Sequence, residues 1–204
     1  MPSSMSLSHL PAELVYIIAK FIKEARYLNS LVQTCWRLHG LLNPILYQTG
    51  IHTLHGFPLV WGAKHSSEVT IRRAFDAGAS THTCHYNLKQ SLVAAVDNSH
   101  ETIVRLILEQ SRDRSVFKSY QSCNLCECQR SIADIPRFIY PLDLAIVRGN
   151  AAIVRLLLAY KITFKYTHRC CGSVYFDLVF AAVKHGHLAV LQVIIEARDT
   201  LNDE

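Results

Sequence analysis

The sequence predicts an all-α fold in which a small helical unit precedes a stack of helical repeats. Half of the 204 residues are hydrophobic and 18% are charged, a balance typical of a chain with a buried core. After residue 55, four segments share one order of features: a helix with small side chains, a polar turn and a strongly apolar helix. Such a unit cannot bury its apolar face alone, so adjacent units must cover one another.

The polar turns set the register of the four repeats. Ser67, His100, Asn150 and His187 occupy equivalent turn positions, separated in order by 33, 50 and 37 residues. Relative to a 33-residue period, the longer spacings are insertions of 17 and 4 residues. The repeats therefore fill residues 55–204, with the long insertion near 111–139.

Each repeat pairs two helices of different character. Small side chains in the first helix let neighbouring helices approach closely: Gly62, Ala63, Ala94, Ala95, Ala145, Ala181 and Ala182. The second helix is apolar on nearly all sides, as in the runs 103–108 and 153–158. A helix of this kind must be covered from both sides.

These units resemble ankyrin repeats. Pro58-Leu59 and Pro141-Leu142 match the start of that repeat, Gly186-His187 matches its turn, and residues 153–158 (Ile-Val-Arg-Leu-Leu-Leu) match its second helix. The resemblance implies helix-turn-helix repeats joined by short hairpins, and a protein that binds other proteins.

The N-terminal residues 5–50 predict three short helices. Pro11 followed by acidic Glu13 is typical of a helix start, and apolar residues then recur at helical spacing, namely Leu14, Ile17, Ile18 and Phe21. A second helix is expected over 27–35. A third, beginning near Trp36, is expected to end or kink at Pro44, whose ring cannot continue the hydrogen-bond pattern.

This segment resembles an F-box, through Leu10-Pro11-Ala12-Glu13-Leu14, Thr34-Cys35-Trp36-Arg37-Leu38 and Pro44-Ile45-Leu46-Tyr47. The combination with ankyrin-like repeats is similar to a family common in filamentous fungi. That resemblance implies a substrate receptor of an SCF-type cullin-RING ubiquitin ligase, whose F-box contacts a Skp-type adaptor. The implied contact residues are Leu10, Pro11, Leu14, Ile18, Leu31 and Cys35. The alternative is that these helices only cap the repeats, which leaves a plain ankyrin scaffold without ligase coupling.

A target is expected on the face formed by the first helices of the repeats. Curved repeat stacks bind extended protein surfaces there. The residues expected to be presented are Val60, Trp61, Val93, Asp143 and Phe180. The alternative is that the aromatic side chains are buried between repeats.

Cysteines concentrate in the connections between repeats. Cys123, Cys126, Cys128, Cys170 and Cys171 follow second helices, so they could converge on a zinc ion. A second Cys-x-x-Cys pair, which would strengthen that interpretation, is missing. Zinc is thus a possible cofactor, and no other cofactor is expected.

Other functional classes have little support. The net charge is only +5 and no run of three Lys or Arg occurs, which argues against nucleic-acid binding. No signal peptide or membrane span is recognisable, which favours the cytoplasm or nucleus and reduced cysteines. No catalytic motif is present, so we expect a protein that is not an enzyme and has no catalytic residues. A zinc-dependent or cysteine-based enzyme is the remaining alternative of a different class.

Overall fold

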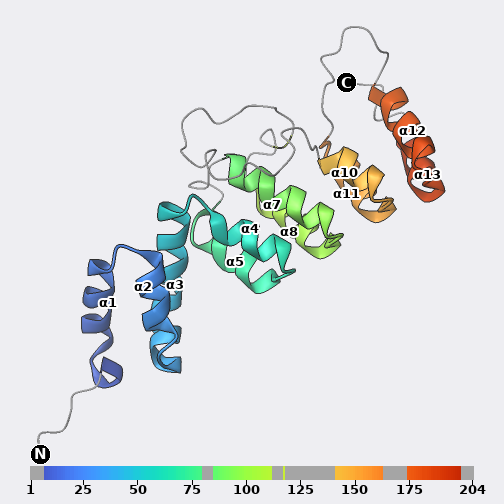
Figure 1. Cartoon of the computed structure of the whole chain (residues 1–204). Coiled ribbons are helices and arrows are strands. Elements are labelled where there is room, and N and C mark those ends of the chain that lie inside the picture. Colours follow the sequence, from blue (N-terminus) through green and yellow to red (C-terminus); the bar gives the residue numbers. More distant parts are fainter. Residues whose placement is uncertain (1–6, 80–84, 112–116, 118–140, 163–173, 199–204) are drawn as a thin grey trace, which may run out of the picture.

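The computed structural model describes residues 7–79, 85–111, 117, 141–162 and 174–198 (Figure 1). Every regular element within these ranges is a helix, and none of these residues lies in a strand. The all-α prediction is confirmed for this part of the chain. The helices follow one another along an elongated molecule, from α1 at one end to α12 and α13 at the other (Figure 1).

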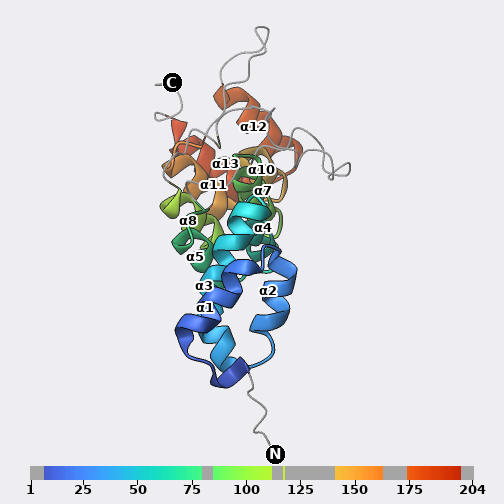
Figure 2. The same ribbon diagram turned by 90° about the vertical axis from the view of Figure 1, so that its left-hand side faces the viewer.

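The N-terminal unit consists of a short 3-10 helix, Leu7–His9, and the helices α1 (Ala12–Phe21), α2 (Ala25–Val32) and α3 (Trp36–Thr53). Both α1 and α2 pack against α3 (Figure 2). The guanidinium of Arg37 on α3 donates a hydrogen bond to the carbonyl oxygen of Leu10 (2.8 Å). Six buried side chains form the core of this unit: Val15, Ala19, Leu28, Val32, Leu38 and Leu42.

In this unit the second helix ends earlier than predicted, and the third helix does not end at Pro44. The second helix ends at Val32 rather than at residue 35, and the sulfur of Cys35 instead accepts a hydrogen bond from the backbone N–H of Leu38 at the start of α3 (3.5 Å). The third helix continues through Pro44 to Thr53. Packing on both sides of the proline explains this continuation, because Leu42 lies in the N-terminal core and Ile51 in a second, larger core.

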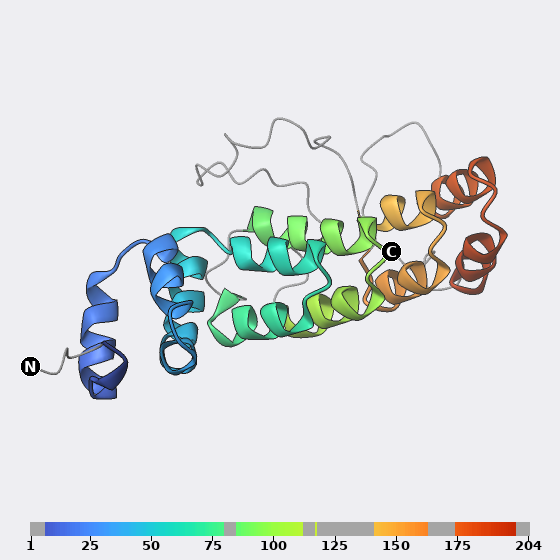
Figure 3. The same cartoon turned by 60° about the horizontal axis from the view of Figure 1, so that its bottom comes forward.

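Four helix pairs follow α3. They are α4 (Phe57–Lys64) with α5 (Glu68–Asp76), α7 (His85–Asp97) with α8 (Glu101–Gln110), α10 (Pro141–Val147) with α11 (Ala151–Ala159), and α12 (Val174–Lys184) with α13 (Leu188–Glu196). The first helices contact one another in chain order, and so do the second helices. Figure 3 shows the two resulting rows. The pairs therefore stack side by side.

The four turns within the pairs have the same geometry. In each, a backbone N–H donates to the carbonyl oxygen five residues earlier, at 2.9 to 3.0 Å, and the donors are Ser67, His100, Asn150 and His187. The preceding residue has a positive φ in every case: 53° at Ser66, 57° at Ser99, and 71° at both Gly149 and Gly186. The predicted equivalence of these four turns is confirmed.

One hydrophobic core runs through all four pairs, from Ile51 to Ile194. One of the expected small residues, Gly62, lies at a close approach between α4 and α5. A Cβ atom on Gly62 would be 3.0 Å from the Cδ1 atom of Ile71, a distance at which the Ile71 side chain would have to shift. The second helices contribute fully buried aliphatic side chains, such as Ile103 and Ile107 on α8.

Candidate functional site

The N-terminal unit exposes more large apolar side chains than its small core can cover. Helix α1 buries Val15 and Ala19 but leaves Leu14, Ile17 and Phe21 exposed. These three residues follow one another at helical spacing, so they lie along one side of α1, and we call them the α1 stripe. The exposed fraction reaches 80% for Phe21, and it is 87% for Trp36 at the start of α3.

The burial of the side chains on α1 defines which side of this helix faces the core. Of the four apolar residues that recur at helical spacing, Leu14, Ile17 and Phe21 are exposed and Ile18 is half-buried. Val15 and the small Ala19 face α3 instead. A helix with apolar residues on most of its circumference offers two possible faces, and packing against α3 selects one of them.

The six residues proposed for adaptor contact divide into two groups. Pro11 and Leu14 are exposed, whereas Leu10, Ile18, Leu31 and Cys35 are half-buried. Leu10, Leu31 and Cys35 also pack against the N-terminal core. Pro11 and Leu14 are exposed and outside that core, so altering them should disturb it least. Phe21 and Trp36 are not among the predicted contact residues, although both are more exposed than Leu14.

The residues expected on the first-helix face differ in exposure along the stack. Trp61 and Phe180 are exposed, and Val60 and Asp143 are half-buried. Val93 has an exposed fraction of 7%, so the expectation that it is presented is not met. It lies on α7, which packs between α4 and α10, and these neighbours cover it. The ring of Trp61 stacks on His65 with a centroid distance of 4.4 Å.

Two histidines in the turns, His65 and His187, contact backbone carbonyl groups. His65 Nδ1 lies 2.8 Å from the carbonyl oxygen of Trp61. His187 Nε2 lies 3.0 Å from the carbonyl oxygen of Val147, which joins the third and fourth pairs. Elsewhere in the stack, burial lowers the pKa of Lys89 on α7, because desolvation disfavours its charged form.

The zinc prediction concerns residues outside the described ranges. Cys123, Cys126, Cys128, Cys170 and Cys171 all lie in segments of which the structure gives no description. Within the ranges it does describe, no group of three or more His, Cys, Asp or Glu residues could hold a metal ion. The zinc interpretation stays a prediction.

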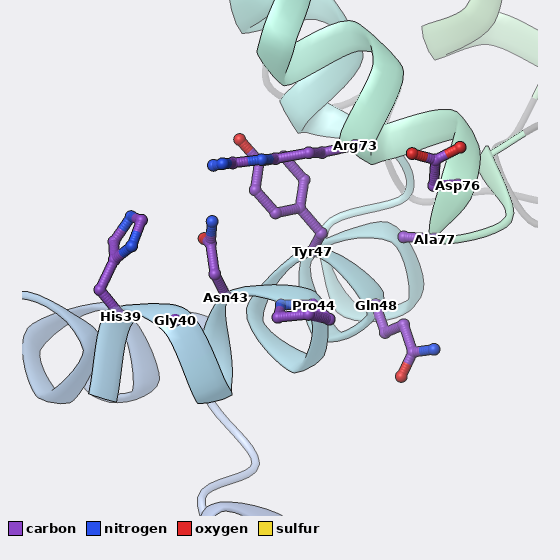
Figure 4. Close-up of a pocket in the computed structure, with 9 residues that line it drawn as sticks. All are labelled: His39, Gly40, Asn43, Pro44, Tyr47, Gln48, Arg73, Asp76 and Ala77. Carbon is purple, nitrogen blue, oxygen red and sulfur yellow. The ribbon is translucent and has the colours of Figure 1, made fainter. Parts of the chain in front are cut away.

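A pocket that the sequence analysis did not anticipate lies between the N-terminal unit and the first helix pair. Its volume is about 280 Å³, and α3 lines it with His39, Asn43 and Tyr47, while α5 contributes Arg73 and Asp76 (Figure 4). The hydroxyl of Tyr47 donates to Thr70 Oγ1 across the two helices (3.4 Å). The pocket thus combines polar and charged side chains at a joint between two cores.

Asn43 is the unusual residue of this pocket. Its exposed fraction is 8%, yet no hydrogen bond engages its side-chain amide in the part of the chain described. Buried polar groups in proteins nearly always have a hydrogen-bond partner, and leaving one unsatisfied costs about 1 to 3 kcal/mol. An unsatisfied amide facing a pocket therefore indicates room for a polar group.

Comparisons with known proteins do not identify the chain. No helix in the described ranges is long and apolar enough to cross a membrane. No protein-family model, no curated protein and no solved structure matches the sequence or the fold.

Proposed function

We propose that this chain is a protein-interaction module of the F-box and ankyrin-repeat type. In this proposal, the N-terminal unit binds a Skp-type adaptor of an SCF-type cullin-RING ubiquitin ligase in the cytoplasm or nucleus. The stacked helix pairs hold the target, and the chain itself performs no chemistry. The observation that carries the proposal is the exposure of the α1 stripe and Trp36 on a unit with only a small core.

The repeated geometry of the helix pairs supports the ankyrin-type part of the proposal. Four pairs have the same turn hydrogen bond and the same positive φ before it, and one core runs through all of them. Stability in such an array comes mainly from contacts between neighbouring repeats. Side chains on the outer face are then free to vary with the partner. The exposed aromatic residues Trp61 and Phe180 are the strongest candidates for target contact.

The apolar surface of the N-terminal unit supports adaptor binding. Contiguous exposed apolar residues on a soluble protein usually mark a site of interaction. Leu14, Ile17 and Phe21 share one side of α1, and Pro11 precedes them at the start of that helix. This side of α1 faces away from its own core, so a partner can reach it without unfolding the unit.

One observation favours the alternative of a plain scaffold. Helix α3 packs against both α4 and α5, and Ile51 near its C-terminal end belongs to the core of the repeats. The N-terminal unit therefore also covers the first helix pair, as a cap does. Capping and adaptor binding use different surfaces, since α3 contacts the repeats and the α1 stripe is exposed.

Gel filtration of the full chain with a purified Skp-type adaptor tests the proposal. The variant Pro11→Ala with Leu14→Ala removes two exposed side chains, so it should keep its thermal stability and lose co-elution. Val69→Ala on α5 is the control, because Val69 is also apolar and exposed but lies on the repeats. Failure of the unaltered chain to co-elute with the adaptor would favour the scaffold alternative.

A further inference from the structure

Arg73 lies at a repeat position that is aliphatic in the other three helix pairs. Counting six residues on from the turn residue of each pair (Ser67, His100, Asn150 and His187) gives Arg73, Leu106, Leu156 and Val193. Leu106 and Val193 are buried and Leu156 is half-buried, whereas Arg73 is exposed. In the later pairs this position belongs to the stack's apolar core. In the first pair it faces the pocket beside α3, so a cation stands where the pattern would place an aliphatic side chain.

Among the residues that the structure describes, Arg73 also differs from its neighbours in having no acidic partner. Arg72 forms an ion pair with Glu68 one turn earlier (2.8 Å), and Arg105 forms the corresponding pair with Glu101 in the next repeat (2.9 Å). No ion pair or hydrogen bond engages the Arg73 guanidinium in the described structure. The N–H groups of this guanidinium can therefore donate hydrogen bonds to a bound ligand.

The amide of Asn43 extends into the same pocket from the opposite helix. Figure 4 shows it rising from α3 toward the guanidinium of Arg73, with His39 on the same side of the pocket. Asp76 lies on the other side, next to Ala77. A buried amide and an unpaired cation thus face one space, and an acceptor carrying negative charge would satisfy both.

We propose that this pocket binds a carboxylate group, with Arg73 and Asn43 as its hydrogen-bond donors. A guanidinium matches the two oxygens of a carboxylate in a bidentate geometry. The volume of about 280 Å³ is near the lower limit of ligand pockets, which suits a small organic acid or one acidic side chain of a peptide. Asp76 repels an anion from its own side, so the carboxylate is seated at the end formed by Arg73 and Asn43. This site does not depend on adaptor binding.

Nuclear magnetic resonance titration of the full chain tests the site with two probes, succinate and the peptide acetyl-Gly-Glu-Gly-amide. We expect saturable chemical-shift changes of the Asn43 side-chain amide. The probe with the lower dissociation constant shows whether the site prefers a free organic acid or an acidic side chain of a peptide. Arg73→Gln should weaken binding about tenfold or more, the effect of losing a charge-assisted hydrogen bond. Asp76→Asn should strengthen binding, because it removes the repulsion.

Arg72→Gln is the matched control. It removes an arginine one residue away that is paired with Glu68, so succinate or peptide affinity should stay unchanged. Circular dichroism verifies that each variant is folded, and Asn43→Leu gives an independent test of the second donor. No saturable shift with either probe would overturn the proposal, and so would equal binding by the chain and its Arg73→Gln variant. Arg73 would then be only a polar residue covering the end of the stack.

Discussion

The two ends of the helix stack are covered in different ways. At the N-terminal end, α3 packs against α4 and α5 and covers the first pair. At the C-terminal end, Val183 on α12 and Ile195 on α13 have exposed fractions of 60% and 52%. The residues at the position of Val183 in the other three pairs are fully buried, with exposed fractions of 0%: Ala63, Val96 and Ile146. The same repeat position is thus core or surface depending on whether a further pair lies beside it.

This difference shows where the stability of the stack resides. An aliphatic side chain stabilises the fold in proportion to the apolar area that its neighbours remove from water. Inner pairs have neighbours on both sides, whereas the described neighbour of the last pair lies on one side only. Exposed side chains outside the inner pairs contribute little to this stability, so they are free to serve binding, as the α1 stripe does in our proposal.

The largest effect is expected from truncating a valine in the inner stack. Val96 and Val183 occupy the same repeat position, with exposed fractions of 0% and 60%. Val96→Ala should lower the free energy of unfolding by about 2 to 3 kcal/mol, through lost burial and the cavity left behind. Val183→Ala should cost less than about 0.5 kcal/mol. Urea denaturation of both variants measures the difference, and equal costs would show that the last pair is covered as well as the inner ones.

Replacing either of two turn glycines by alanine is expected to have an intermediate effect on stability. The two variants form a second matched pair. Gly149 and Gly186 both have a φ of 71°, but a Cβ on Gly149 would be 2.7 Å from the His187 ring, whereas one on Gly186 would meet nothing within 4 Å. Gly186→Ala should cost about 1 to 2 kcal/mol through the left-handed backbone alone. Gly149→Ala should cost more, because it also displaces His187 from the Val147 carbonyl. Thermal denaturation should give a lower melting temperature for Gly149→Ala than for Gly186→Ala. The reverse order would contradict the proposed contact between the third and fourth pairs.

The smallest effect is expected from a surface ion pair between the second and third pairs. Arg148 Nε donates to Asp97 Oδ1 (3.0 Å), and both side chains are about half exposed. Exposed pairs of this kind contribute roughly 0.2 to 1 kcal/mol, and salt screens them. Asp97→Asn should therefore lower stability by no more than that, and the loss should shrink in high salt. A loss that is independent of salt would instead assign Asp97 a structural role beyond the ion pair.

The helix pairs could be predicted from the sequence because their signals are local. A polar turn between a helix of small residues and an apolar helix recurs at Ser67, His100, Asn150 and His187, and each turn makes its own hydrogen bond. The continuation of α3 through Pro44 could not be predicted in this way, because it depends on packing in two separate cores. The inward face of α1 likewise depends on contact with α3.

The pocket was missed because its residues come from helices far apart in the sequence. Asn43 and Arg73 line one pocket because α3 packs against α5. One signal was nevertheless present in the repeats, since an arginine stands at residue 73 where residues 106, 156 and 193 are aliphatic. A charged residue at an otherwise apolar repeat position indicates that its neighbours differ from those of the other repeats.

Hydrogen–deuterium exchange of the full chain, with and without a purified Skp-type adaptor, tests the central claim most directly. Exchange reports local protection along the backbone, so it compares the two ends of the molecule in one experiment. Our account predicts slower exchange over α1 when the adaptor is present, and unchanged exchange over α12 and α13. Protection confined to α12 and α13, with none over α1, would contradict the assignment of adaptor binding to the N-terminal unit.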